Sequence, residues 1–142
     1  MTVRAILDLK GRDVVTITSD HTLAQAAEHL TSHKIGALVV LADGRVSGIL
    51  SERDIVRAVS RGGAAALGSR VGDTMTSAGT TCQPHDTLAR RINPMTAGRF
   101  RHLPVVDDGR LAGIISIGDA VKYRLAEIER ESSALQEYIR TA

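Results

Sequence analysis

The sequence of 142 residues is poor in aromatic residues and in cysteine. Its only Phe and Tyr residues are Phe100, Tyr123 and Tyr138, and it has no Trp, so a core must be built from Val, Ile, Leu and Ala. The same scarcity argues against a platform for single-stranded nucleic acid, because such platforms stack bases on aromatic rings. Cys82 is the single cysteine, which excludes an intrachain disulfide and fits a reducing compartment.

Long apolar runs and blocks of like charge are absent too. No stretch approaches the roughly 18 apolar residues of a membrane-spanning helix, and residues 1–15 lack the apolar run of a signal peptide. The 18 basic and 16 acidic residues are interspersed and leave a net charge of +2. Even with a pI of about 9.0, that excess is too small to indicate a nucleic-acid binder. We therefore expect a cytoplasmic protein with no membrane partner.

Apolar spacing predicts a mixed α/β chain. Helical spacing and alternation indicate, in order, a helix over 1–9, a strand over 14–18, a helix over 23–33 and strands over 37–41 and 45–50, with a tight turn at 43–44. A further helix opens at Ser51 and stops at 62–63. The small residues of 62–70 predict a flexible linker, followed by a short helix over 71–75 and a short strand over 80–82.

The second half of the chain repeats the first. A shift of 65 positions superposes residues 16–54 on 81–119 without a gap, and places Thr22-Leu23-Ala24 on Thr87-Leu88-Ala89. A unit present only twice is not a solenoid, which needs at least three copies. The strand runs are too apolar for a sheet with one wet face. We expect two β-α-β-β-α units with their sheets packed together about a pseudo-twofold axis and their helices outside.

Each copy ends with the same strand-to-helix turn. A glycine and an apolar pair lead to a serine that is followed three residues later by an aspartate: Ser51 and Asp54 in the first copy, Ser116 and Asp119 in the second. The serine oxygen can cap the helix, and the aspartate lies where the helix dipole favours a carboxylate. Taken singly, each turn is an ordinary helix start. Its duplication gives it more weight.

With these features the chain resembles a tandem pair of cystathionine β-synthase (CBS) domains, a CBS pair or Bateman module. The resemblance depends on the duplicated Gly-Ile-x-Ser-x-x-Asp ends, on Thr-Leu at each first helix, on residues 101–106, and on 71–76, which are similar to the family's Val-x-Asp-x-Met-Thr lead-in. It implies an α/β (α+β) fold of two CBS repeats. We divide the chain into repeat 1 with the N-terminal helix (1–62), a linker (63–70), repeat 2 (71–122) and a C-terminal helical extension (123–142).

The resemblance implies a regulatory protein, not an enzyme. Such a protein binds an adenine nucleotide or adenosyl compound in clefts between the repeats and signals to an unknown protein target. AMP, ADP and ATP are the implied ligands, with S-adenosylmethionine and NADH as further candidates. A carboxylate at Asp54 or Asp119 can accept hydrogen bonds from both ribose hydroxyls. Ser51 or Ser116, with the N–H groups of the helix start, can hold a phosphate.

Other candidate ligand-binding residues are also implied by position. Positive charge around a polyphosphate would come from Arg53, Lys34, Arg99, Arg101 and His102. Residues around the base would be Ile17, Thr18, Gly36 and Ala37 in one repeat, with Cys82, Gln83, Arg101 and His102 in the other. Alternative roles stay open for Arg53, as a solvated helix residue, and for His102, as cover for a strand edge. Cys82 can also be read as a small buried hydrophobe.

Two departures from the family pattern bear on the clefts. The second copy has Gly118 where the first has Arg53, so the two clefts should differ in charge. Pro94 falls inside the helix expected over 88–97 and predicts that this helix is broken or displaced. No metal site is expected, because His29 and His33 form the only metal-like spacing and lack further ligands.

The C-terminal segment carries an apolar seam. Spacings of 4, 3, 4, 3 and 4 residues separate Val121, Leu125, Ile128, Ser132, Leu135 and Ile139. The seam can fold back on its own domain, but we expect it to pack on a second subunit, giving a homodimer held by the CBS pair and the C-terminal helix. The alternatives to a nucleotide-binding regulator are a scaffold with empty clefts, a nucleic-acid binder, and an enzyme, for which no nucleophile, base and orienter set is recognisable.

Overall fold

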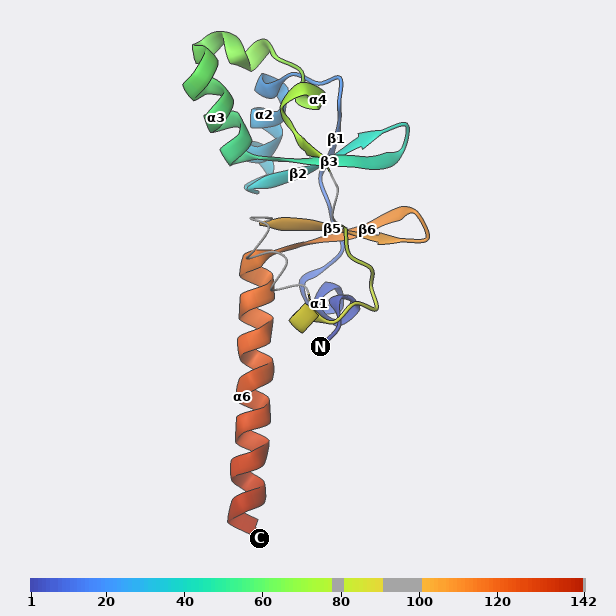
Figure 1. Ribbon diagram of the computed structural model, residues 1–142, viewed down its shortest axis with the longest axis vertical. Coiled ribbons are helices and arrows are strands. Elements are labelled where there is room, and N and C mark those ends of the chain that lie inside the picture. Colours follow the sequence, from blue (N-terminus) through green and yellow to red (C-terminus); the bar gives the residue numbers. More distant parts are fainter. Residues whose placement is uncertain (78–80, 91–100, 142) are drawn as a thin grey trace.

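The protein is built from two sheets that lie one above the other with helices on their outer faces (Figure 1). The computed structural model describes residues 1–77, 81–90 and 101–141. Among these residues one sheet has the strand order β1-β2-β3-β4 and the other the order β5-β6. Strand β3 contacts both β5 and β6. The predicted packing of two apolar sheets against each other is therefore confirmed.

The first repeat has the predicted β-α-β-β-α order. Its elements are β1 (Thr16–Thr18), α2 (Leu23–His33), β2 (Ala37–Ala42), β3 (Arg45–Ser51) and α3 (Glu52–Gly62). Strand β2 pairs in parallel with β1 and antiparallel with β3. The two-residue turn between β2 and β3 has φ of 52° at Asp43 and 77° at Gly44, values that Asp-Gly turns accommodate in a hairpin. Helix α2 begins at a capping box, in which Thr22 Oγ1 accepts a 3.2 Å bond from Gln25 N.

The second repeat follows the same plan where the structure describes it. It contains β5 (His102–Asp107), β6 (Arg110–Ser116) and α6 (Ile117–Thr141). Cys82 forms a parallel bridge with Val105, because its N–H donates to Pro104 O at 3.0 Å and its carbonyl accepts from Val106 N at 2.8 Å. The helix expected over 88–97, with Pro94, lies mostly outside the described residues.

The helix that precedes each repeat packs on the other repeat. Helix α1 (Val3–Lys10) buries Val3, Ile6 and Leu7 in the core of the second repeat, whose other members include Cys82, Leu88, Leu103, Val105 and Ile115. Helix α4 (Val71–Thr74) buries Val71 in the core of the first repeat, with Ile17, Leu23, Leu38 and Leu50. Each helix therefore connects the two halves of the molecule.

Backbone hydrogen bonds reinforce this exchange in the same way at both places. Val3 N donates to Asp86 O at 2.9 Å, in the loop before the second repeat's first helix. Val71 N donates to His21 O at 2.7 Å, in the corresponding loop of the first repeat. Arg4 N and Gly72 N make similar bonds, so the first two N–H groups of each short helix find acceptors in the repeat on which the helix lies.

The segment that the sequence assigned to a linker contains a short helix that its composition did not indicate. Residues Gly63–Gly68 form a 3-10 helix, η1, that contacts α2 and α3, and Leu67 packs on the core of the first repeat. A single apolar side chain among small residues gave little sign of this packing. Strand β4 (Thr76–Ser77) then pairs with β3.

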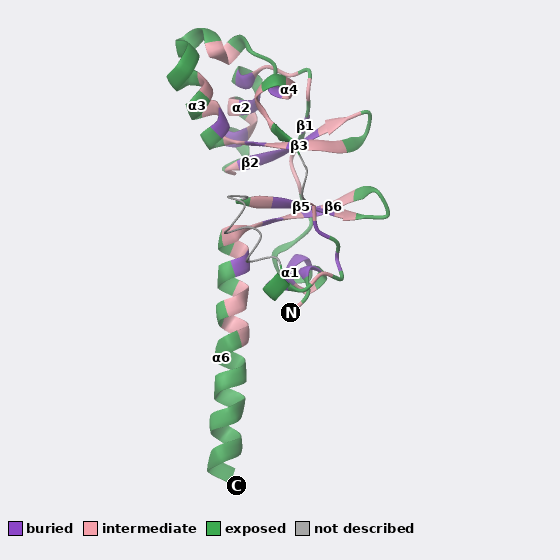
Figure 2. Ribbon diagram, viewed as in Figure 1, coloured by how far each residue is buried: buried purple, intermediate pink, exposed green. Residues whose placement is uncertain are grey.

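Helix α6 extends well beyond the two sheets (Figure 1). It has 25 residues, and Figure 2 shows it green from its middle to its end, because every residue from Ile128 to Thr141 is exposed. Near its start Ala120 is buried and Tyr123 packs on the core. Within the part of the chain that the structure describes, no helix combines the length and apolar character needed to cross a bilayer.

Candidate functional site

The first candidate turn fixes one oxygen of Asp54. Asp54 N donates to Ser51 Oγ at 3.3 Å, and Ser51 N donates to Asp54 Oδ2 at 2.9 Å, which completes a capping box at the start of α3. Arg57 Nη1 lies 3.7 Å from the other oxygen, Oδ1. Asp54 is buried, so its carboxylate is held in one orientation at the positive end of a helix.

The second turn has the same bonds and one additional cation. Asp119 N donates to Ser116 Oγ at 3.0 Å, and Ser116 N donates to Asp119 Oδ2 at 3.0 Å. Lys10 Nζ, from the end of α1, lies 2.6 Å from the same Oδ2 and donates to Ile114 O at 2.9 Å. The exchanged position of α1 is what brings this lysine to the second repeat.

The electrostatics of Asp119 follow from these contacts. Burial acts to raise the pKa of the Asp119 carboxyl, but the hydrogen bonds from Lys10 and Ser116 and the charge of Lys10 outweigh it, so the pKa is lowered. The carboxylate stays ionised at neutral pH. It can accept hydrogen bonds through Oδ1, which bonds to no described residue.

His102 lies beside this turn, because strand register pairs it with Ser116. Its pKa is lowered first by burial and then by the charges of Arg101 and Lys10, while Asp119 and Glu52 act in the opposite direction. The ring is therefore neutral at pH 7. Since Glu52 belongs to the first repeat, charges from both repeats act on the same histidine.

The structure divides the predicted site residues into two groups at the turns. Around Asp54, Ser51 pairs with Ala37 across the strands, and the N–H of Glu52 donates to Gly36 O at 3.0 Å. Around Asp119, Ser116 pairs with His102, and Ile117 N donates to Arg101 O at 2.7 Å. The side chains of Arg53 and Arg101 are exposed.

Other predicted residues lie away from the turns. Thr18 is level with Leu41, four residues along β2 from Ala37, and its hydroxyl contacts His21 Nδ1 at 2.7 Å. The side chains of Ile17 and Cys82 are buried in the two cores, so a ligand can meet these residues only through their backbone. Gln83 and Lys34 are exposed, and Arg99 lies outside the described residues.

Sequence reasoning missed two charged residues, Lys10 and Glu52. Lys10 is separated from Asp119 by 109 positions, so no local pattern indicates their contact. The duplication did not indicate this contact either, because it relates the two halves in sequence and does not show that α1 packs on the other half. For Glu52, its place beside the capping serine was the available signal.

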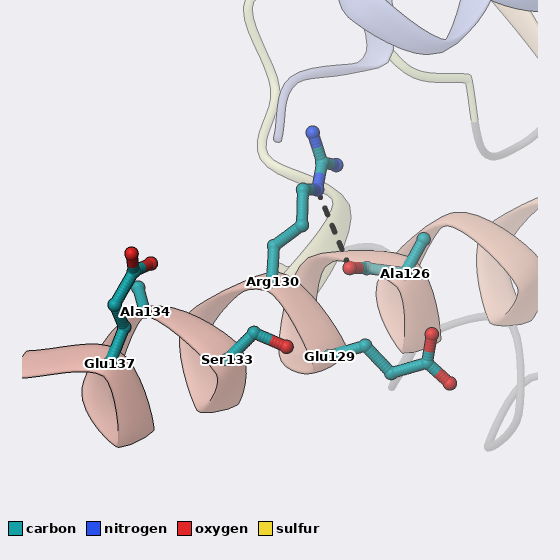
Figure 3. Close-up of a pocket in the computed structure, with 6 residues that line it drawn as sticks. All are labelled: Ala126, Glu129, Arg130, Ser133, Ala134 and Glu137. Atoms are coloured by element: carbon teal, nitrogen blue, oxygen red, sulfur yellow. Dashed lines mark hydrogen bonds between the residues drawn. The ribbon is translucent and has the colours of Figure 1, made fainter. Parts of the chain in front are cut away.

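A hollow along α6 lies away from both turns (Figure 3). Its lining residues all belong to α6: Ala126, Glu129, Arg130, Ser133, Ala134 and Glu137. Arg130 Nε donates to Ala126 O at 3.4 Å across it. A hollow with a single wall cannot enclose a small molecule, so we do not assign it a ligand.

Comparison with known proteins identifies the class of protein. The family model of the CBS domain matches residues 6–61 and, a second time, residues 71–126. The chain therefore belongs to the CBS domain family and carries a tandem pair of these domains, as its resemblance indicated.

Individual relatives support this assignment. The crystal structure of the CBS-domain containing protein ATU1752 from Agrobacterium tumefaciens is 53% identical, with a TM-score of 0.83, and the match covers 87% of this chain and 99% of that one. The mitochondrial CBS domain-containing protein CBSX3 from Arabidopsis thaliana is 33% identical over 97% of this chain and 71% of its own length. The CBS domain pair of MJ0100, solved with 5-methylthioadenosine and S-adenosyl-L-methionine, is 23% identical with a TM-score of 0.78 and covers 89% of this chain and 98% of its own; this likeness shows the fold alone.

Proposed function

We propose that this protein is a regulatory CBS pair that binds an adenine nucleotide or adenosyl compound at its two serine-aspartate turns and passes the signal to a protein target. The observation that carries the proposal is the orientation of the two aspartates. In each turn a backbone N–H fixes Oδ2, as Ser51 N does for Asp54 and Ser116 N for Asp119. A pre-oriented carboxylate accepts a pair of hydroxyl groups without an added ordering cost.

The chemistry of a ribose fits such a group. Its 2′ and 3′ hydroxyls are adjacent donors, and a carboxylate offers two oxygens with several acceptor sites. At the second turn, Lys10 and the exposed Arg101 supply positive charge near Asp119, which suits a phosphate attached to the same ribose. The adenosyl ligands of MJ0100 support the choice of ligand class. AMP, ADP, ATP and S-adenosylmethionine are the compounds to test first.

Isothermal titration of the full chain with these compounds tests the proposal, using Asp54→Asn and Asp119→Asn. Asparagine retains an acceptor for the capping N–H, so the helices should keep their starts. Loss of a charged hydrogen-bond acceptor should weaken binding at the affected turn by about 10- to 100-fold. For 2′-deoxy analogues, the affinities of the variants and of the unaltered protein should differ much less. Asp43→Asn, in an exposed hairpin turn, is the matched control and should bind normally.

The other outcomes assign other functions. If no adenosyl compound binds to the unaltered protein, the empty scaffold replaces the regulator. If both aspartate variants bind the ligand with the affinity of the unaltered protein, the two turns are not part of the binding site. Binding of DNA or RNA that weakens steeply with salt would instead favour the nucleic-acid alternative.

A further inference from the structure

The apolar seam of α6 is uncovered along its whole length. Leu125 is 55% exposed, Leu135 60% and Ile139 66%, and Val121 and Ile128 are also among the exposed large hydrophobic residues. Alternating spacings of four and three residues place these side chains and Ser132 on one stripe, as positions a and d of a heptad. The seam therefore has the pattern of a helix that packs lengthwise on another helix.

The domain that carries α6 uses a different side of the helix. Ala120 and Tyr123 contact the core of the second repeat. Arg124 forms an ion pair with Glu127 one turn further along the helix. At 100° per residue, Arg130, Ser133 and Glu137 of the hollow in Figure 3 face away from the seam. None of the described residues of this chain covers the seam, which leaves it open to a partner.

We propose that the seam pairs with the same seam of a second copy, with the two α6 helices parallel and in register. The flanking charges carry this choice. In the heptad set by Leu125 and Ser132 at a, Arg124 occupies g and Glu129 occupies e. Parallel pairing places g of one helix beside the following e of the other, so Arg124 meets Glu129 of the second copy on both sides of the seam.

Antiparallel pairing is disfavoured by the same residues. The antiparallel register that matches all six seam positions places Glu129 against Glu129 and Glu131 against Glu131 of the second copy, and like charges in these positions repel. It also places each Ser132 against Ile128. In parallel register the two Ser132 hydroxyls face each other and can bond, and a polar residue at a specifies register. Arg124 keeps donors for Glu129 although it also bonds to Glu127, because a guanidinium has five N–H groups.

Disulfide trapping in the full chain tests orientation and register. Ser132→Cys, Leu125→Cys and Ile139→Cys each place a thiol on the seam, and Ser133→Cys places one on the opposite face as the matched control. Under mild oxidation each seam variant should give at least tenfold more covalent dimer than Ser133→Cys. Buried Cys82 is common to all variants and gives the same background.

Two results would overturn the proposal. In the first, which antiparallel helices would give, Leu125→Cys and Ile139→Cys each form no covalent dimer when oxidised separately, but Leu125→Cys forms one with Leu135→Cys when the two variants are mixed. No covalent dimer from any seam variant would mean that the seam meets another protein or its own domain. Because these positions are exposed, the substitutions should leave the fold intact, which far-ultraviolet circular dichroism can check.

Charge exchange gives an independent test by sedimentation equilibrium. Glu129→Lys should weaken the dimer by about fivefold, because it places Lys beside Arg124 of the second copy. Adding Arg124→Glu should return the dissociation constant toward its original value. Glu137→Lys makes the same charge change on the face away from the seam and is the matched control. Equal effects of Glu129→Lys and Glu137→Lys, or no recovery in the double variant, would refute the pairing. This inference does not depend on the proposed ligand, since it involves residues of α6 alone.

Discussion

Replacing Lys10 with methionine should show how strongly the exchanged helix α1 is held at the second turn. Lys10 Nζ lies 2.6 Å from Asp119 Oδ2, and the two side chains are 26% and 23% exposed. An exposed ion pair contributes about 0–1 kcal/mol and a hydrogen bond to a charged group about 1.5–3 kcal/mol, so a partly exposed pair should contribute about 1 kcal/mol. Methionine retains much of the apolar stem. For a chain of this size the melting temperature should fall by about 3 °C.

The pH dependence identifies the contribution as electrostatic. Because the pKa of Asp119 is lowered in the folded state, the unfolded chain holds the proton more tightly. The stabilisation is therefore complete above the ordinary value of 3.8 and is lost as the pH falls through the folded pKa. A double-mutant cycle of Lys10→Met and Asp119→Asn, measured by urea unfolding, should give a coupling of about 1 kcal/mol at pH 7 that disappears near pH 2.

The matched control is Arg12→Met. Arg12 pairs with Asp8 near the same end of α1, but these side chains are 51% and 58% exposed, so solvent screens the pair. Its free energy of unfolding should change by no more than about 0.3 kcal/mol. A Lys10–Asp119 coupling of zero at pH 7, or one that persists unchanged at pH 2, would refute the reasoning.

Two further predictions concern His102 and the glycines of strands β3 and β6. Because the pKa of His102 is lowered in the folded state, the unfolded state binds a proton first as the pH falls below 6.5, and the free energy of unfolding should fall with the pH. In His102→Gln, the free energy of unfolding measured in urea should change less between pH 7 and pH 5. The same change with pH in both proteins would contradict this. Gly48→Ala should cost about 2–3 kcal/mol, because its Cβ would meet the backbone oxygen of Thr76 at 2.5 Å. The equivalent Gly113→Ala would meet the methyl carbons of the buried Leu7 at 2.7 and 3.0 Å; it should cost about 1–2 kcal/mol, because a side chain can shift more than a paired strand backbone. Thermal melting that ranks the two variants in reverse would refute the distinction.

Local chemistry explains why most of the fold could be predicted from the sequence. The helix over 23–33 has the predicted limits because its first residue follows a threonine that completes a capping box. The hairpins could be placed because Asp-Gly turns permit positive φ at both residues. The duplication then indicated two units whose apolar strands need cover on both faces. Each of these signals extends over a few residues or repeats along the chain.

The parts that sequence reasoning did not reach depend on contacts between distant segments. Nothing in residues 3–10 indicates that they pack on the second repeat, because their apolar spacing would fit either core equally well. The 3-10 helix of 63–68 depends on α2 and α3 for its packing, and its own composition resembles that of a loop. Of the candidate site, the two serine-aspartate turns were correctly located as helix starts. Their part in ligand binding stays a prediction.

The exchange of α1 makes the two turns chemically different despite their common pattern. Under the 65-residue shift, His102 corresponds to Ala37 and Glu52 corresponds to Ile117. A neutral imidazole, on which the charge of Glu52 acts, therefore lies beside Asp119, whereas the equivalent positions of the other repeat are apolar. Lys10 adds a cation that contacts Asp119, while the ion-pair partner of Asp54 is Arg57 at 3.7 Å. Asp54→Asn and Asp119→Asn therefore alter two dissimilar environments, so that a ligand dependent on its phosphate charge should respond to them unequally.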